Sequence, residues 1–226
     1  MSDIAIFSGD RAAHYDDFVS RWIPAYRQII DSIPGLLHIY DSDAESPKLI
    51  VGCGTGNELA AINQHRPDWK LVGIDPSPEM VMQARARLNG IKNIEIKDAR
   101  IEDLDTEHKF GAATLLLVLH FIPDDGNKLD LLKEIGKRLN PGAALTLVDI
   151  YGSSTSIDKQ LQMLKGMLLS ENDEATLNER LVAIKERIQY ISEDRLAELL
   201  REAGFSTPAK FFQAAIYGGW VTRKVA

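Results

Sequence analysis

Cysteine is nearly missing from this sequence of 226 residues, which contains Cys53 and no other cysteine. One cysteine cannot build an internal disulfide framework or a cysteine-based zinc cluster, and a chain of this kind is typical of a reducing compartment. The five histidines are scattered without the paired spacing of metal ligands. We therefore predict a cytoplasmic protein without a metal site.

Long apolar runs and an excess of positive charge are also missing. The most apolar stretch, residues 112–119, is far shorter than the roughly 20 residues that span a membrane, and the amino terminus gives no sign of a signal peptide. The 26 Lys and Arg against 33 Asp and Glu give a net charge of −7, which opposes non-specific binding to nucleic acid or anionic membranes. We expect a small-molecule partner, no direct nucleic-acid or membrane binding, and leave a homodimer open.

The composition that remains, 45% hydrophobic and 26% charged, is that of a folded globular protein. We predict a single domain over residues 1–226. Its expected parts are amino-terminal helices at 1–45, a ligand-binding core at 46–150, a helical insertion at 157–190, and a closing helix with strands at 191–226.

The apolar periodicity changes along the chain and predicts alternating strands and helices. Strands are expected at 48–51, 69–74, 91–97, 113–119, 143–150, 207–213 and 217–223, and helices at 57–64, 78–88, 128–139 and 192–203. Residues 12–33 predict two helices or one kinked at Pro24, ended by Pro34 and Gly35. This order indicates an α/β fold with a doubly wound, mostly parallel seven-stranded sheet, an antiparallel C-terminal strand and helical additions.

Glycines and acids gather where the first three strands end. Gly52, Gly54 and Gly56 follow the first strand with the spacing Gly-x-Gly-x-Gly, whereas a dinucleotide fingerprint counted from Gly52 would need glycine at Asn57. Asp75 ends the second strand, where a carboxylate can accept hydrogen bonds from ribose hydroxyls, and Asp98 ends the third strand. Two acids on consecutive strand ends suit an adenosine.

Residues 50–57, these two acids, and the segments LHFIP at 119–123 and LNPGAALTLVD at 139–149 resemble the class I S-adenosylmethionine-dependent methyltransferases. The resemblance covers most of residues 48–150. It implies that S-adenosylmethionine is the cofactor and S-adenosylhomocysteine the product. The methionine part of the cofactor would face the glycine turn, the ribose would face Asp75, and the adenine would face Asp98 and Ala99. The cofactor-binding residues so implied are Tyr26, Gly52, Cys53, Gly54, Gly56, Asp75, Pro76, Asp98, Ala99 and Leu116.

One position departs from that family. Most members carry an acid two residues before the first glycine, where this chain has Ile50. The departure puts the anchoring of the cofactor's amino group in doubt.

The two ends of the chain, DDFVSRWIPAYRQII at 16–30 and FFQAAIYGGWVTRK at 211–224, resemble those of carboxy-S-adenosylmethionine synthases. By this resemblance Tyr26 would contact the cofactor, and the reaction would make a carboxylated cofactor from prephenate for tRNA wobble-uridine modification. Tyr26 is equally explained as a core aromatic on a helix. Leu116 stands where those synthases have asparagine, and Arg180 matches their carboxylate-binding arginine only after one gap, so it could also be an ordinary solvated charge.

We predict an S-adenosylmethionine-dependent methyltransferase acting on an unidentified small-molecule acceptor. The alternatives are a carboxy-S-adenosylmethionine synthase, a non-catalytic S-adenosylmethionine or S-adenosylhomocysteine binding protein, and, against the glycine spacing, a nicotinamide-dependent reductase. The catalytic residue is unknown, because His120 fits a general base or a structural hydrogen-bond partner, and Cys53 fits a turn residue or an activated thiol. We expect residues 16–30 and 157–190 to form a lid over the cofactor.

Overall fold

Seven strands form one mixed sheet in the computed structural model, which describes residues 14–40 and 43–225. The strands are β1 (Lys48–Val51), β2 (Leu71–Asp75), β3 (Ile94–Asp98), β4 (Phe110–Leu116), β5 (Leu139–Ile150), β6 (Ala209–Ala214) and β7 (Tyr217–Arg223). Their order in the sheet is β3-β2-β1-β4-β5-β7-β6. β1 to β5 pair in parallel, and β7 is antiparallel to both β5 and β6. The predicted fold class is confirmed.

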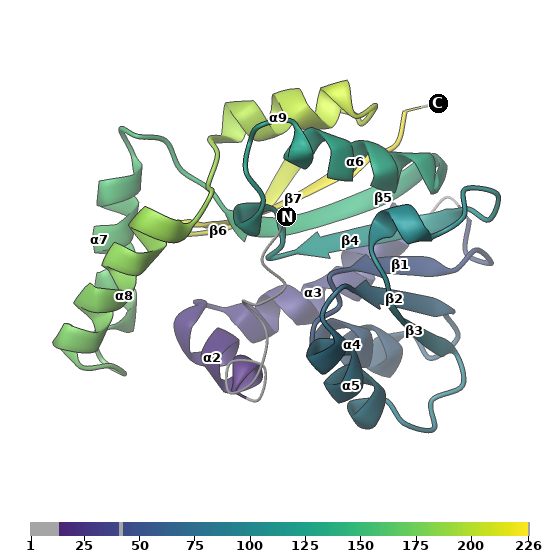
Figure 1. The fold of residues 1–226 in the computed structure, drawn as a ribbon, viewed down its shortest axis with the longest axis horizontal. Helices are drawn as coiled ribbons and strands as arrows, with labels where there is room; N and C mark the ends of the chain where they lie inside the picture. Colours follow the sequence, from purple (N-terminus) through teal and green to yellow (C-terminus); the bar gives the residue numbers. More distant parts are fainter. Residues whose placement is uncertain (1–13, 41–42, 226) are drawn as a thin grey trace.

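Helices cover both faces of the sheet (Figure 1). They are α2 (Tyr15–Trp22), α3 (Tyr26–Ile39), α4 (Asn57–His65), α5 (Pro78–Arg87), α6 (Asn127–Lys137), α7 (Ile157–Leu168), α8 (Glu174–Arg187) and α9 (Glu193–Glu202), with the short 3-10 helices η2 (Ile101–Asp103) and η3 (Leu119–Phe121). α6 and α9 lie over one face, and α3, α4 and α5 lie under the other (Figure 1). Buried apolar side chains form a separate core on each face.

The prediction that the amino-terminal region divides at Pro24 is confirmed, because α2 ends at Trp22 and α3 begins at Tyr26. The predicted start at residue 12, like residues 1–13 of the expected amino-terminal part, lies outside the described residues. Ser77 caps α5 as its hydroxyl accepts the N–H of Met80.

The prediction that Pro34 and Gly35 end the second helix is wrong, since α3 continues to Ile39. A proline inside a helix removes one hydrogen bond and costs about 3 kcal/mol. Ile33 and Leu37 beside it are fully buried, and burying two such side chains contributes roughly 3–6 kcal/mol. The core under α3 therefore outweighs the local helix-breaking signal.

The fourth and fifth strands also differ from their predicted limits. β4 ends at Leu116 rather than at residue 119, because Leu117 turns the chain out of the sheet with a φ of 59°. β5 begins at Leu139 rather than at 143, and residues 140–142 form a bulge inside the strand, with a register shift opposite β4. β2 and β3 start at Leu71 and Ile94, later than the predicted 69 and 91.

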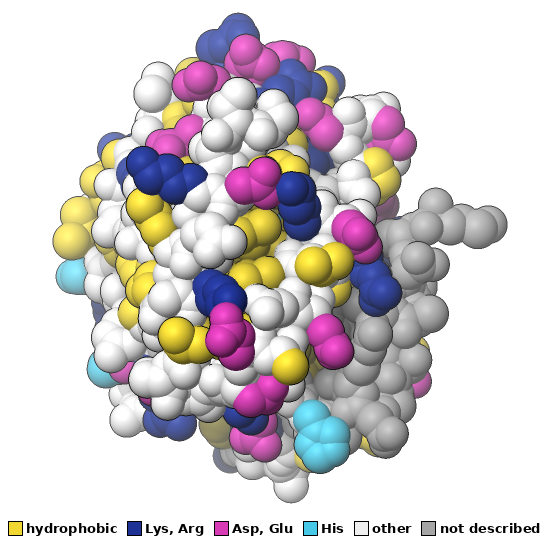
Figure 2. Space-filling view, turned by 90° about the vertical axis from the view of Figure 1, so that its left-hand side faces the viewer, with side chains coloured by type: hydrophobic (Ala, Val, Ile, Leu, Met, Phe, Trp, Pro, Cys, Tyr) yellow, Lys and Arg dark blue, Asp and Glu magenta, His cyan; other side chains and the backbone are white. Residues whose placement is uncertain are grey.

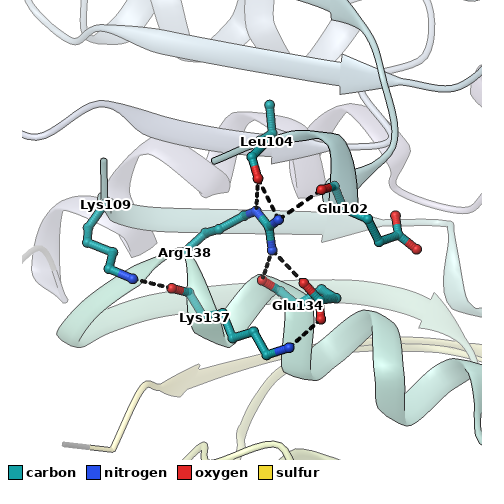
Figure 3. Close-up of polar contacts among 6 residues, drawn as sticks. All are labelled: Glu102, Leu104, Lys109, Glu134, Lys137 and Arg138. Carbon is teal, nitrogen blue, oxygen red and sulfur yellow. Dashed lines mark hydrogen bonds and ion pairs between the residues drawn. The ribbon is translucent and has the colours of Figure 1, made fainter. Parts of the chain in front are cut away.

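A buried arginine holds the segment that follows β3 against α6 (Figure 3). Arg138 donates from Nε and Nη2 to the carbonyl oxygen of Leu104 at 3.1 and 2.6 Å, and from Nη2 to that of Glu102 at 3.2 Å. Its Nη1 donates to Oε2 of Glu134 at 2.7 Å. These bonds give the buried guanidinium its partners and hold the segment after β3 in place.

The helical additions lie together beyond one end of the sheet. α7 and α8 pack against each other, and α2 joins them through a buried apolar cluster that includes Val19, Trp22, Leu164 and Leu181. The face that carries α7 and α8 mixes exposed apolar side chains with charges of both signs (Figure 2). The helices expected to form a lid therefore share one core.

Candidate functional site

Three glycines shape the loop between β1 and α4. Gly52, Gly54 and Gly56 have φ values of 71°, 53° and 83°, in the left-handed region that favours glycine. A Cβ at Gly52 would lie 2.5 Å from Cγ2 of Val118, whereas one at Gly54 would meet nothing nearer than Tyr15 Cε1 at 3.9 Å. The backbone at Gly54 is therefore open to close approach by a ligand.

Asp75, at the end of β2, holds this loop in place. Its Oδ2 accepts the N–H of Gly54 at 2.9 Å, and its Oδ1 accepts the N–H of Ser77 at 2.9 Å. Burial raises the pKa of the Asp75 carboxyl, the two N–H donors lower it, and the nearby charge of Asp98 raises it.

The third strand end lies beside the second. Asp98 pairs in register with Asp75, and the N–H of Ala99 donates to the Asp75 carbonyl oxygen at 3.2 Å. Asp98 and Pro76 are exposed. The structure thus brings Asp75, Pro76, Asp98 and Ala99 to one corner of the sheet.

A small pocket of about 30 Å³ opens on the inner side of the glycine loop. Its lining consists of Tyr15, Tyr26, Ile30, Gly52, Cys53, Gly54, Thr55, Asn57, Glu58, Leu116 and Leu117. Five of the residues predicted to bind cofactor therefore line it, whereas the acids of β2 and β3 lie outside it. The volume suits about two water molecules, so an amino-acid-sized ligand needs a neighbouring side chain to move.

Tyr15 of α2 lies against this pocket, and the sequence patterns did not single it out. Burial raises the pKa of its hydroxyl, and the pKa is raised further by Tyr26 and Asp75. Burial also raises the pKa of Tyr26, to about 12. Both phenols therefore stay protonated near neutral pH.

Polar contacts tie the start of α2 to the glycine loop. Oδ1 of Asp16 accepts from Thr55 Oγ1 at 2.5 Å and from Asn57 Nδ2 at 2.8 Å, and Arg87 forms an ion pair with the same carboxylate. The side chains of Arg87 and Asp16 are 33% and 34% exposed, so solvent screens the pair and it contributes no more than about 1 kcal/mol. The ion pair with Arg87 therefore adds little to the contacts that hold α2 over the pocket.

Cys53 is buried in the loop, and burial raises the pKa of its thiol. A protonated, buried thiol is a weak nucleophile. The structure therefore favours the turn-residue alternative for Cys53.

Glu58, in the first turn of α4, was also missed. It is buried, burial raises its pKa to about 7, and the Thr114 hydroxyl lowers the pKa in part. A signal was present in the sequence, because position 58 shares a helix face with the buried Ile62 one turn later. Because acids are rarely buried on the apolar face of a helix, the position of Glu58 in the sequence marks it as a candidate functional residue.

The loop after β4 is held by Asp149 at the end of β5. Its Oδ2 accepts the N–H groups of Val118 at 3.1 Å and Leu119 at 2.8 Å, and its Oδ1 lies 2.6 Å from His120 Nδ1. The buried Lys128 donates to the Leu119 carbonyl oxygen at 2.5 Å. This arrangement favours the structural alternative for His120, because its ring helps to fix the loop.

Arg180 of α8 stacks on two aromatic side chains of α2. Its Cζ lies 3.8 Å from the ring centroid of Phe18 and 4.5 Å from that of Trp22. Burial lowers the pKa of the guanidinium to about 10, and the nearby Tyr217 raises it. Arg180 is therefore half-buried between α2 and α8. This placement argues against the alternative that it is an ordinary solvated charge.

Across residues 14–40 and 43–225, no cluster of three or more His, Cys, Asp or Glu could hold a metal ion. None of the helices in this part of the chain has the length and apolarity to cross a membrane.

Comparison with known proteins gives a consistent picture. Residues 49–145 match a family model described as a methyltransferase domain. Carboxy-S-adenosyl-L-methionine synthases from Helicobacter pylori (strain Shi470) and Histophilus somni (strain 2336) are 29% and 26% identical, covering 95% and 96% of this chain and 92% of each relative.

Solved structures of methyltransferases share the fold. A magnesium protoporphyrin IX methyltransferase from Synechocystis PCC 6803 with bound SAH superposes with a TM-score of 0.68 at 14% identity, covering 97% of this chain and 96% of the other. A plantazolicin methyltransferase in complex with a triazolic desmethylPZN analog and SAH superposes with a TM-score of 0.71 at 15% identity, covering 100% of this chain and 95% of the other. Residues 49–145 are therefore similar to a methyltransferase domain, and the sheet order is that of a fold shared with solved S-adenosylmethionine-dependent methyltransferases.

Proposed function

We propose that this enzyme binds S-adenosylmethionine beyond the carboxyl ends of β1, β2 and β3 and methylates a small-molecule acceptor. The observation that carries the proposal is the hydrogen bond from Gly54 N–H to Asp75 Oδ2, which joins a glycine cradle to a strand-end acid. That is the place where open α/β sheets bind their ligands.

The residues around the loop fit the parts of this cofactor. In the proposal, Asp75 and Pro76 face the ribose, and Asp98 and Ala99 face the adenine, as their common corner of the sheet allows. The methionine end faces the pocket, through Tyr26, Gly52, Cys53, Gly54 and Leu116. Gly56 immediately precedes α4 and has a φ that only glycine adopts easily.

S-adenosylmethionine supplies a methyl group on a positively charged sulfur, and as the acceptor's lone pair bonds to the methyl carbon, the electron pair of the broken C–S bond stays on sulfur. The chain's contribution is to bind, orient and exclude water. Tyr15 of α2 and Tyr26 of α3 line the pocket, so these helices lie where they can cover the reacting groups, and α7 and α8 pack against α2. We assign no general base, because His120 is buried and is not among the residues that line the pocket.

Transfer of a labelled methyl group tests this proposal. Purified protein is incubated with a small-molecule extract and S-adenosylmethionine carrying a trideuterated methyl group, with Asp75→Ala as the control, and products are analysed by mass spectrometry. Small molecules that gain the label only with the unmodified protein support methyl transfer. Tight cofactor binding with no labelled product in any extract contradicts it and favours the non-catalytic alternative.

Arg180 favours a second candidate, a carboxy-S-adenosylmethionine synthase. A carboxylated cofactor needs a cation for its extra charge, and Arg180 is a half-buried guanidinium between α2 and α8. The relatives of that name at 26–29% identity support it too. Against it, Leu116 offers no polar group at the pocket wall.

Incubation with S-adenosylmethionine and prephenate separates the two candidates. We expect no carboxylated sulfonium by mass spectrometry. The control is Arg187→Ala, because Arg187 is an exposed arginine of the same helix. If the unmodified protein and Arg187→Ala form the carboxylated sulfonium and Arg180→Ala does not, the synthase reaction replaces methyl transfer as the proposed function.

A further inference from the structure

The strand position that carries an acid in most of the family is apolar here. Ile50 lies two residues before Gly52 and is fully buried. The methionine end of the cofactor carries an α-ammonium group, and an ammonium taken out of water needs an acceptor or a counter-charge. Ile50 can supply neither.

Glu58 brings a carboxyl group close to the same place from the next element. Thr114 of β4 pairs in register with Ile50 of β1, so the two side chains leave the same face of the sheet. The Thr114 hydroxyl lies near enough to the Glu58 carboxyl to lower its pKa. The Glu58 carboxyl group therefore lies beside the strand position where Ile50 replaces an acid.

The same carboxyl group faces the pocket under the glycine loop. Glu58 is among the residues that line the pocket, and its charge raises the pKa of Cys53 in the loop and of Tyr26 in α3. Glu58 therefore lines the same pocket as the loop and α3 residues that, in the proposal, face the methionine part of the cofactor.

The carboxyl group has an unused acceptor. Glu58 is 6% exposed, and its Oε1 has no hydrogen-bond partner among the described residues. In that part of the chain no Lys, Arg or His contributes to its pKa, which burial raises. A buried carboxylate without a cation is costly, and a positively charged ligand would remove that cost.

We propose that Glu58 binds the α-ammonium group of the cofactor's methionine end and replaces the strand acid whose position Ile50 occupies. This inference rests on the proposed function, because it takes S-adenosylmethionine as the cofactor. In this proposal the carboxylate that binds the α-ammonium group comes from the first turn of α4 instead of the end of β1.

Calorimetric titration with two ligands tests the contact. The ligands are S-adenosylhomocysteine and its desamino analogue, which lacks only the α-amino group, and the proteins are the unmodified chain, Glu58→Gln, and Glu107→Gln as an exposed control. We expect the unmodified chain and Glu107→Gln to prefer S-adenosylhomocysteine by roughly tenfold or more. Glu58→Gln should lose most of that preference while still binding both ligands.

The pH dependence of binding gives a second readout. In the described part of the chain, the charge of Glu58 acts on Tyr26 and Cys53, and Tyr15 lines the same pocket. Burial raises the pKa of all three groups, of Tyr26 to about 12. With a pKa of about 7 for Glu58, affinity for S-adenosylhomocysteine should rise by about tenfold between pH 6 and pH 8. The rise should be absent in Glu58→Gln.

Each outcome bears on a separate claim. A Glu58→Gln variant that keeps both the ligand preference and the pH dependence of the unmodified chain would overturn the role of Glu58 and leave the cofactor assignment intact. Failure of the unmodified chain to bind S-adenosylhomocysteine at all would overturn the proposed function, and the inference with it.

Discussion

Gly54 and Asp75 lie in different elements, and a 2.9 Å hydrogen bond from the Gly54 N–H to Asp75 Oδ2 joins them. The bond ties the loop after β1 to the end of β2, at the edge of the sheet where both strands finish. One carboxylate therefore shapes the glycine loop and, in our proposal, holds the ribose.

Replacement of Asp75 by alanine should weaken binding of S-adenosylhomocysteine by roughly 10- to 100-fold, because each hydrogen bond to a charged acceptor contributes about 1.5–3 kcal/mol. Calorimetry measures the loss, with Asp68→Ala, whose side chain is 63% exposed, as the control. Equal affinity in Asp75→Ala and the unmodified chain would remove Asp75 from the cofactor site.

Glu58 should make the free protein less stable as pH rises. Its folded-state pKa of about 7 lies above the ordinary value of 4.5, so the folded state holds a proton that the unfolded state has lost between these pH values. The free energy of unfolding should fall through this window by at most about 1.4 kcal/mol per pH unit. Urea unfolding of the unmodified chain and Glu58→Gln at several pH values measures the difference, and parallel pH profiles would contradict the assignment.

Asp149→Ala should destabilise the protein by about 3 kcal/mol or more. Asp149 accepts the N–H groups of Val118 and Leu119 and contacts His120, and each buried donor left without a partner costs about 1–3 kcal/mol. Urea unfolding at pH 7 measures the change. A loss within 0.5 kcal/mol, the usual range for an exposed substitution, would mean that the loop after β4 does not depend on this carboxylate.

α2 and the α7 and α8 pair should become more protected when cofactor binds. They share one apolar cluster, and the contact of Asp16 with Arg87 holds α2 to the site only weakly. Amide hydrogen exchange in residues 16–30 and 157–190 should slow on addition of S-adenosylhomocysteine. The same exchange rates with and without the ligand would count against a lid.

Local patterns predicted the features that depend on neighbouring residues. The place of the glycine loop after β1 and the strand-end places of Asp75 and Asp98 follow from short stretches of sequence. The conformation of such stretches depends mainly on their own residues, so periodicity and spacing were sufficient to locate the loop and the strand ends.

Features that depend on distant partners were not predicted. β4 ends where Asp149, from the next strand, takes the N–H groups of the following loop. Pro34 stays inside α3 because the core beneath that helix compensates for the lost hydrogen bond. Glu58 becomes a site candidate once the fold places it beside Thr114. In each case tertiary contacts override the local signal.

Titration of the purified protein with S-adenosylhomocysteine, with NAD as the competing cofactor, tests the central claim most directly. The account predicts saturable heat that fits one site per chain for S-adenosylhomocysteine, and no binding of NAD at the same concentrations, because Asn57 breaks the dinucleotide fingerprint. Saturable binding of NAD with none of S-adenosylhomocysteine would contradict it.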